Sequence, residues 1–167
     1  MSNPTQTDRQ TRPLYTSEER ARRDATVWTL VQGVLAPVQF AVFVASLALV
    51  CRFLLTGEGY FAASLSIVIK TLTLYAIMVT GAVWEREVFG CYLFAPPFFW
   101  EDVVSMLVLA LHTAYLAALF LGALSPRGQM LLALAAYASY VVNAGQFVWK
   151  LRLARLEAAR PAPEGAP

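Results

Sequence analysis

Apolar residues fall into four long blocks along the chain, separated by short polar segments. The blocks cover residues 28–55, 61–84, 103–124 and 130–149. Each block supplies the run of about 20 apolar residues that a helix needs to cross a hydrocarbon core of ~30 Å. The pattern predicts an all-α membrane protein with transmembrane helices at about 28–55, 61–84, 101–124 and 130–149. We expect them to form one antiparallel bundle, a single membrane domain over residues 1–167.

The composition agrees with this pattern. The chain is 58% hydrophobic and 14% charged, with a mean hydropathy of +0.55, whereas about a quarter of the residues of a soluble domain are charged. The basic residues stand next to hydrophobic helices, where they more often set topology and contact anionic headgroups than bind nucleic acid. The composition therefore predicts a lipid bilayer as partner and no nucleic acid.

The positions of lysine and arginine predict the orientation. Ten of them flank the first block, the fourth block or the segment between the second and third, and two, Arg52 and Arg127, lie in the opposite turns. Because the more basic side usually stays in the cytoplasm, we expect both termini there. Residues 1–26 then form a cytoplasmic segment and residues 150–167 a basic tail, disordered after Arg160.

A short helix is predicted before the first span. Thr16 and Glu19 have the spacing of a capping box, at the start of a run of helix formers from Leu14 to Asp24. The arginines of this segment suit an interfacial helix, held against headgroups or pointing to water.

The segment between the second and third spans differs from the two opposite turns, which are short and contain Gly or Pro. Residues 84–102 carry four carboxylates and seven aromatic side chains, so we expect function near this face. Motifs for nucleotide or metal cofactors are missing, and Cys51 and Cys91 are predicted at opposite ends, where they do not pair.

The four carboxylates divide by local electrostatics. Glu101 and Asp102 fall in the first turn of the third span, where the helix dipole favours the ionised form, and Glu85 and Glu87 follow the end of the second, where it disfavours ionisation. Such a split suits a general acid and a general base. Ordinary carboxylates in a solvated loop are the alternative.

Polar residues inside the spans are expected to be partnered or functional. His112 shares one helical stripe with Glu101, Ser105, Val108 and Tyr115, which predicts an inward-facing position. Two roles are possible for His112: it forms a hydrogen bond that packs the helices together, or it acts as a ligand or proton carrier.

Lys70 is predicted to snorkel to the outer interface. Asn143 and Gln146, near Tyr137 and Tyr140, are predicted to bridge helices, with the lining of a pocket as the alternative.

The aromatic side chains at the inner face also have two interpretations. Trp84, Phe99 and Trp100 suit an interfacial aromatic belt. The same side chains suit the binding of a flat apolar macrocycle or quinone.

Several strings in the sequence resemble those of the vinyl (bacterio)chlorophyllide hydratases of anoxygenic phototrophic bacteria. They are Leu14 to Asp24, Trp28 to Phe40, Trp84-Glu85, Phe94 to Asp102, Leu111 to Tyr115 and Asn143 to Phe147. The resemblance implies addition of water to the C3 vinyl group of (bacterio)chlorophyllide a, giving a 1-hydroxyethyl group during bacteriochlorophyll synthesis. It implies no required cofactor, with magnesium present only as part of the substrate, and an inner (intracytoplasmic) membrane location.

This implied activity assigns hypothetical roles to residues. The acid is Glu85 or Glu87, the base is Glu101 or Asp102, and His112 is an axial ligand to the substrate magnesium or a relay. The expected substrate-binding residues are Trp84, Phe99, Trp100, Tyr115, Tyr140, Asn143, Gln146 and Gln32. A non-catalytic pigment-binding or photosystem-assembly subunit is the alternative function. Other pigment-synthesis enzymes or a second copy of the chain are the expected protein partners.

Overall fold

The computed structural model describes residues 14–158, which form five helices. They are α1 (Ser17–Ala25), α2 (Val27–Thr56), α3 (Tyr60–Phe89), α4 (Phe99–Leu121) and α5 (Pro126–Ala158). The last four contain spans that are long and apolar enough to cross a membrane. The predicted all-α class with four spans and a short N-terminal helix is therefore confirmed. The tail expected to be disordered after Arg160 lies outside the described residues.

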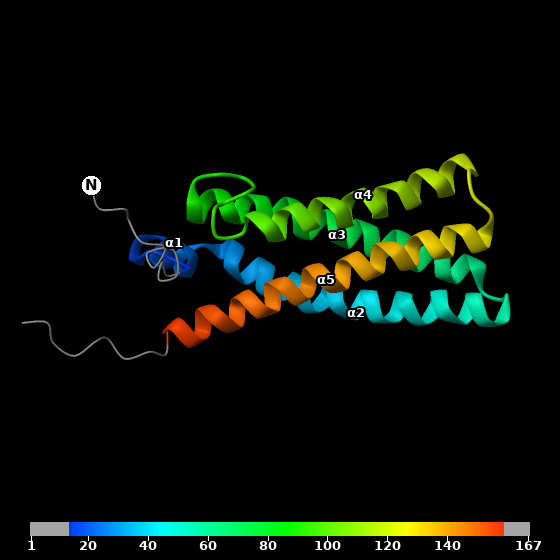
Figure 1. Ribbon diagram of the computed structural model, residues 1–167, viewed down its shortest axis with the longest axis horizontal. Helices are drawn as coiled ribbons and strands as arrows, with labels where there is room; N and C mark the ends of the chain where they lie inside the picture. The colour runs from blue at the N-terminus through cyan, green and yellow to red at the C-terminus, as the bar shows by residue number, and fades with distance from the viewer. Residues whose placement is uncertain (1–13, 159–167) are drawn as a thin grey trace, which may run out of the picture.

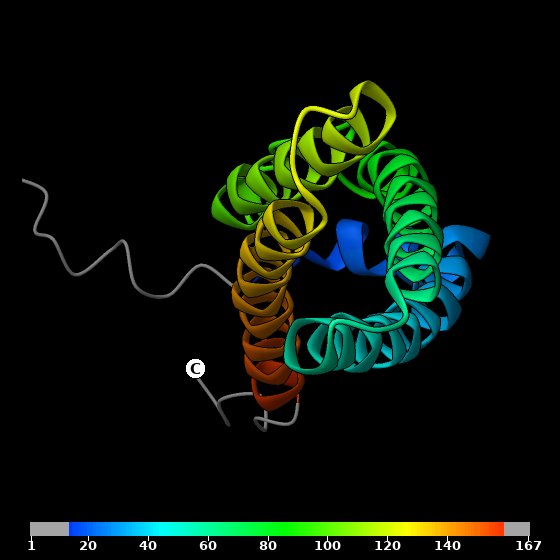
Figure 2. The same ribbon diagram turned by 90° about the vertical axis from the view of Figure 1, so that its right-hand side faces the viewer.

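Successive long helices run in opposite directions and form two hairpins, α2 with α3 and α4 with α5 (Figure 1). Viewed end-on, the four helices surround a common centre (Figure 2). Glycine makes the α2–α3 turn tight, because Gly57 and Gly59 adopt φ values of 76° and 83° that other residues rarely tolerate. The segment between α3 and α4 is longer and lies at the same end as α1 (Figure 1).

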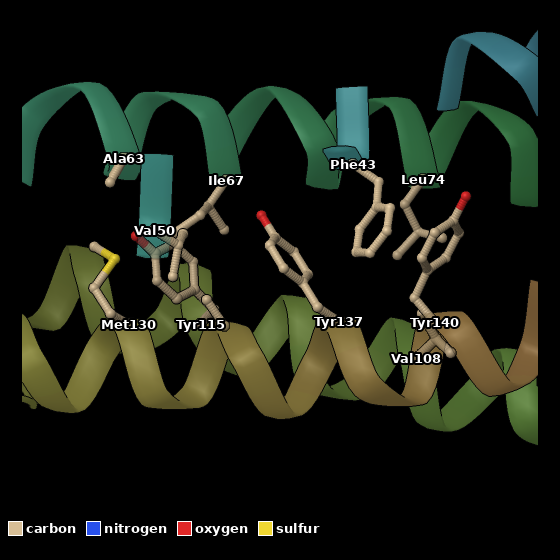
Figure 3. Close-up of a cluster of buried hydrophobic side chains, with 11 residues drawn as sticks. Phe43, Val50, Ala63, Ile67, Leu74, Val108, Tyr115, Met130, Tyr137 and Tyr140 are labelled. Carbon is tan, nitrogen blue, oxygen red and sulfur yellow. The ribbon is translucent and has the colours of Figure 1, made fainter. Parts of the chain in front are cut away.

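The core lies between the two hairpins. Figure 3 shows Phe43, Leu74 and Tyr140 pointing toward one another from α2, α3 and α5. Hydroxyl groups join the hairpins in the same layer, where Ser46 and Tyr137 are 2.6 Å apart. Large apolar side chains such as Phe61 and Phe120 are exposed on the outside, as expected of helices that face lipid.

Two helices extend beyond their predicted ends. α3 continues to Phe89, so Glu85 and Glu87 belong to its last turns and do not follow it. α5 continues to Ala158, so residues 150–158 of the predicted tail are helical. Hydropathy marks the apolar part of a helix, and both helices continue past it.

Helix α1 packs across the end of α3. The predicted capping box is present, because Thr16 accepts from the Glu19 amide and Glu19 accepts from the Thr16 amide. The Nε of Arg22 donates to the Val88 carbonyl over 2.9 Å, which satisfies one of the last carbonyl groups of α3. The Tyr15 ring stacks on Phe89 with centroids 5.8 Å apart.

Candidate active site

Two buried carboxyl groups meet where α3 ends and α4 begins. Glu85, in the last turns of α3, is 6% exposed, and Asp102, in the first turn of α4, is 3% exposed. Their side chains are hydrogen-bonded to each other, although seventeen positions separate them in the sequence. We call Glu85 and Asp102 the carboxyl pair.

The connecting segment 90–98 holds the carboxyl pair with backbone amides. The Phe94 amide donates to Asp102 over 2.7 Å, and the Ala95 amide donates to Glu85 over 3.2 Å. Phe94 has a φ of 61°, a conformation that is costly for a bulky residue. In this conformation of the segment, two consecutive backbone amides point to the two carboxyl groups.

Glu101, the neighbour of Asp102, has a different partner. Its carboxylate lies 2.5 Å from the Nζ of Lys150 on α5, which also donates to the Pro97 carbonyl. Lys150 lies 5.0 Å from the Phe98 ring centroid. Lys150 of α5 therefore joins α4 through the ion pair with Glu101 and the connecting segment through the hydrogen bond to Pro97. The structure leaves Asp102 as the carboxylate that meets Glu85.

Glu87 is separate from the carboxyl pair as well. It is exposed and accepts a hydrogen bond from the Thr26 hydroxyl at the start of α2. Of the four carboxylates predicted from the sequence, the structure thus brings together one from each helix end, Glu85 and Asp102.

Cys91 lies beside the carboxyl pair and reports on its charge. Partial burial raises the pKa of the Cys91 thiol, and the carboxylates of Glu85 and Asp102 raise it further. The thiolate is the form that reacts with alkylating reagents.

We expect Cys91 to alkylate slowly at neutral pH, with a rate that increases only as the pH rises above the ordinary range of a thiol. Replacing both members, Glu85→Gln with Asp102→Asn, removes the negative charge of the carboxyl pair next to the thiolate, so it should lower the pKa of Cys91 and speed alkylation at a fixed pH. Mass spectrometry of iodoacetamide adducts measures the rate, and Cys51 provides an internal reference. An unchanged Cys91 rate in the variant would contradict this charge coupling.

Aromatic side chains form a wall beside the carboxyl pair. Phe98 packs against Trp84, Phe89 and Phe147 with centroid distances of 5.8, 5.8 and 6.0 Å. Phe99 and Trp100, predicted to bind substrate, are 43% and 69% exposed. The structure places the half-buried Trp84 in this wall and leaves Phe99 and Trp100 on the outer surface.

A second polar group lies deeper, between the hairpins. The snorkelling predicted for Lys70 is wrong, because Lys70 is 0% exposed and its Nζ lies 3.8 Å from the Tyr140 ring centroid. The stripe predicted for α4 is confirmed, because Glu101, Ser105, Val108, His112 and Tyr115 are all buried. Helix periodicity sets which face turns inward, and the tyrosine ring gives Lys70 a favourable inward position.

The other predicted residues fall along the same interface. Asn143 donates to the Ser105 hydroxyl over 2.8 Å, which confirms its bridging role between α5 and α4. Gln32 donates to Thr80 over 2.8 Å and so joins α2 to α3. Gln146 is half-buried, and its Oε1 atom has no hydrogen-bond partner among the described residues. Tyr115 is fully buried further from the carboxyl pair.

Two parts of the site were missed by sequence reasoning. In the sequence Lys150 is one of the ten basic residues that indicate topology, and nothing in its spacing reveals that Glu101 is its partner. The Phe94 and Ala95 amides are backbone groups, which no side-chain pattern reports. The two consecutive prolines that follow, Pro96 and Pro97, are the one local sign of a constrained turn.

Comparison with known proteins identifies the family. The family model described as 2-vinyl bacteriochlorophyllide hydratase matches residues 15–153. The chain belongs to this family. The matched range contains the carboxyl pair, Lys150, Lys70 and His112.

Two curated relatives, both named 2-vinyl bacteriochlorophyllide hydratase, are highly similar to the chain. The relative from Rhodobacter capsulatus is 71% identical over 146 residues, which cover 87% of this chain and 85% of that protein. The relative from Cereibacter sphaeroides is 70% identical over 147 residues, which cover 87% of this chain and 91% of that protein. No solved structure matches the chain. The family is thus shown by similarity over nearly the whole hydratase sequence.

Proposed function

We propose that this protein hydrates the C3 vinyl group of (bacterio)chlorophyllide a to a 1-hydroxyethyl group, as a multi-pass membrane enzyme of bacteriochlorophyll synthesis. Its membership of the hydratase family supports the activity. The observation that carries the mechanism is the buried, hydrogen-bonded carboxyl pair. Water addition needs one group that gives a proton and one that takes a proton, and the pair supplies both.

The two carboxyl groups share one proton, because two negative charges at hydrogen-bonding distance repel strongly. Asp102 lies at the N-terminal end of α4, where the helix dipole favours a negative charge. It also accepts the shorter of the two backbone hydrogen bonds, 2.7 Å from the Phe94 amide against 3.2 Å from the Ala95 amide to Glu85. Glu85 lies at the C-terminal end of α3, where the dipole favours the neutral form. We therefore assign Glu85 as the acid and Asp102 as the base.

The proposed reaction proceeds in two proton transfers. Glu85 protonates the terminal vinyl carbon, and the macrocycle delocalises the positive charge that forms on the inner carbon. Asp102 takes a proton from a water molecule as its oxygen bonds to that carbon. The proton then passes from Asp102 to Glu85 through their hydrogen bond. This transfer restores the pair, so the cycle requires no other proton donor and no redox cofactor.

His112 is placed away from this chemistry. It follows Asp102 by ten residues on α4, a rise of about 15 Å. The magnesium of a chlorin lies only about one ring radius from the vinyl substituent. If His112 bound the substrate magnesium, the vinyl group would therefore be too far from the carboxyl pair to react with it. We place His112 at the deep end of the substrate site and assign no proton transfer to it.

The proposed setting is the bacterial inner membrane, with the carboxyl pair at the cytoplasmic end. The supporting observation is the charge asymmetry. Arg86, Lys150 and Arg152 lie at the same end as the carboxyl pair, and Arg52 and Arg127 lie at the other. The substrate is then delivered from the cytoplasm or from the adjoining leaflet.

Membranes that contain this chain as their sole pigment-synthesis protein test the activity. Incubated with the vinyl pigment, they are expected to yield a product heavier by one water molecule, with a blue-shifted absorption band because the vinyl group no longer extends the conjugated system. Chromatography with mass detection measures the product. Pigment that binds but stays unchanged would instead support a carrier or assembly subunit.

A further inference from the structure

A lysine buried among the spans has no acidic partner in the part of the chain that the structure describes. Lys70 of α3 is 0% exposed, and its Nζ has no hydrogen-bond acceptor. Within residues 14–158, the ion pairs are Arg23 with Asp24 and Lys150 with Glu101, so no carboxylate of this region pairs with Lys70. Its one described favourable contact is the Tyr140 ring, 3.8 Å away.

An ammonium group in this position is suited to an anionic ligand. A buried charge is costly unless it is paired, and an aromatic face supplies only part of the compensation. The position is shielded from water, so the anion must enter as part of a large apolar molecule. A carboxylate attached to a macrocycle meets both conditions.

Further polar atoms without partners lie along the same interface. The amide nitrogen and oxygen of Gln39 on α2 are both buried and unpartnered, as is the Oδ1 of Asn143 on α5. Asn143 follows Tyr140 by one helical turn toward the carboxyl pair, and Gln39 precedes Phe43, which packs on Tyr140, by one turn in the same direction. Polar groups thus continue from Lys70 toward the carboxyl pair between the hairpins.

His112 adds an acceptor at the deep end. Its Nδ1 lies 2.8 Å from the Val108 carbonyl, so in the neutral ring Nδ1 carries the hydrogen and the buried, unpartnered Nε2 presents a lone pair. Lys70 interacts electrostatically with this ring. The deep end therefore offers a cation and a hydrogen-bond acceptor, and Gln39 adds an amide donor one turn nearer the carboxyl pair.

We infer that Lys70 binds the free propionate carboxylate of the substrate, and that this contact makes the enzyme selective for the acid form of the pigment over its ester. The inference rests on the proposed hydration, and it names the group that the deep end recognises. A chlorophyllide carries this carboxylate free, whereas a chlorophyll carries it esterified.

The separation of the two ends agrees with the size of such a substrate. Tyr140 lies opposite Leu74 (Figure 3), so the Lys70 side chain, whose Nζ contacts Tyr140, extends toward the carboxyl pair. Leu74 precedes Glu85 by eleven residues, roughly 16 Å of helix rise. In a chlorin with an extended propionate chain, the distance from the vinyl group to the carboxylate, added to the length of the Glu85 side chain, is comparable to this rise.

The test compares the vinyl chlorophyllide with its propionate methyl ester in membranes that contain the full chain. The wild-type protein is expected to favour the acid in kcat/KM by about 10- to 100-fold, because one buried polar contact is lost with the ester. Lys70→Met should lower kcat/KM for the acid by a similar factor and leave the value for the ester unchanged. Arg52→Gln, which removes an exposed positive charge from the end of α2, is the matched control and should keep the preference.

Each other outcome has a separate meaning. If Lys70→Met reduces the two substrates equally, or if the wild-type protein shows no preference, the carboxylate contact is refuted while hydration stands. If the wild-type protein converts neither substrate, the proposed function itself fails. Lys70→Arg is a second test variant. It keeps a positive charge at this position, so it should retain part of the preference for the acid. Thermal melting in detergent shows that each variant is folded.

Discussion

Asparagine in place of Asp102 is expected to lower kcat for vinyl hydration by about 10²- to 10⁴-fold, the usual contribution of a general base. Asparagine has nearly the same shape and keeps an oxygen for the Phe94 amide, so the segment 90–98 should stay in place. It cannot take a proton from water. The rate of hydroxyethyl product formation measures the change, and melting in detergent tests whether the variant is folded.

Glu85→Gln should cause a loss of similar size, because glutamine cannot protonate the vinyl carbon. The double variant should be little worse than either single one, since both residues serve one proton-transfer unit. Glu87→Gln is the matched control, because Glu87 lies on the same helix but is exposed and contacts Thr26. Full activity in either single variant of the pair would remove that residue from the mechanism.

The second large effect concerns stability. Lys150→Met leaves the Glu101 carboxylate and the Pro97 carbonyl without their donor. We expect the free energy of unfolding to fall by about 1–3 kcal/mol. Lys150 is still 21% exposed, so solvent compensates part of the loss and the effect should remain below that of a fully buried pair.

Thermal unfolding in detergent measures this change, with Arg152→Met as the matched control. Arg152 is exposed on the same helix, so its replacement should change the stability by less than about 0.5 kcal/mol. The double variant Glu101→Gln with Lys150→Met should recover part of the lost stability, because no unpaired charge remains. A Lys150→Met protein as stable as the wild type would show that the ion pair contributes nothing.

The fold was largely predictable because membrane spans follow from one-dimensional information. Runs of apolar residues set the number of long helices, and helical periodicity placed Glu101 and His112 on one buried stripe. The Thr16 capping box was also readable, since both partners lie within one turn. Each of these features depends on residues that are close in sequence.

The candidate site was predictable only as a set of residues. The sequence offers four carboxylates as possible acids or bases. Nothing in their spacing shows that Glu85 contacts Asp102 or that Glu101 forms an ion pair with Lys150. That choice depends on how α5 is rotated against α4 and on the path of the segment 90–98. The snorkelling predicted for Lys70 was wrong for the same reason. Its depth could be counted along α3, but the Tyr140 ring that accommodates its ammonium group belongs to a helix seventy positions later.

The contact of α1 with the end of α3 has a consequence for biogenesis. Arg22 and Tyr15 leave the ribosome before α2 and α3 do, yet their partners, the Val88 carbonyl and the Phe89 ring, lie at the end of α3. The segment from Tyr15 to Arg22 is thus made well before its partners, so it stays undocked until α3 is inserted. Its docking also brings the Tyr15 ring to a centroid distance of 6.3 Å from Phe98, the last residue of the segment 90–98 that holds the carboxyl pair.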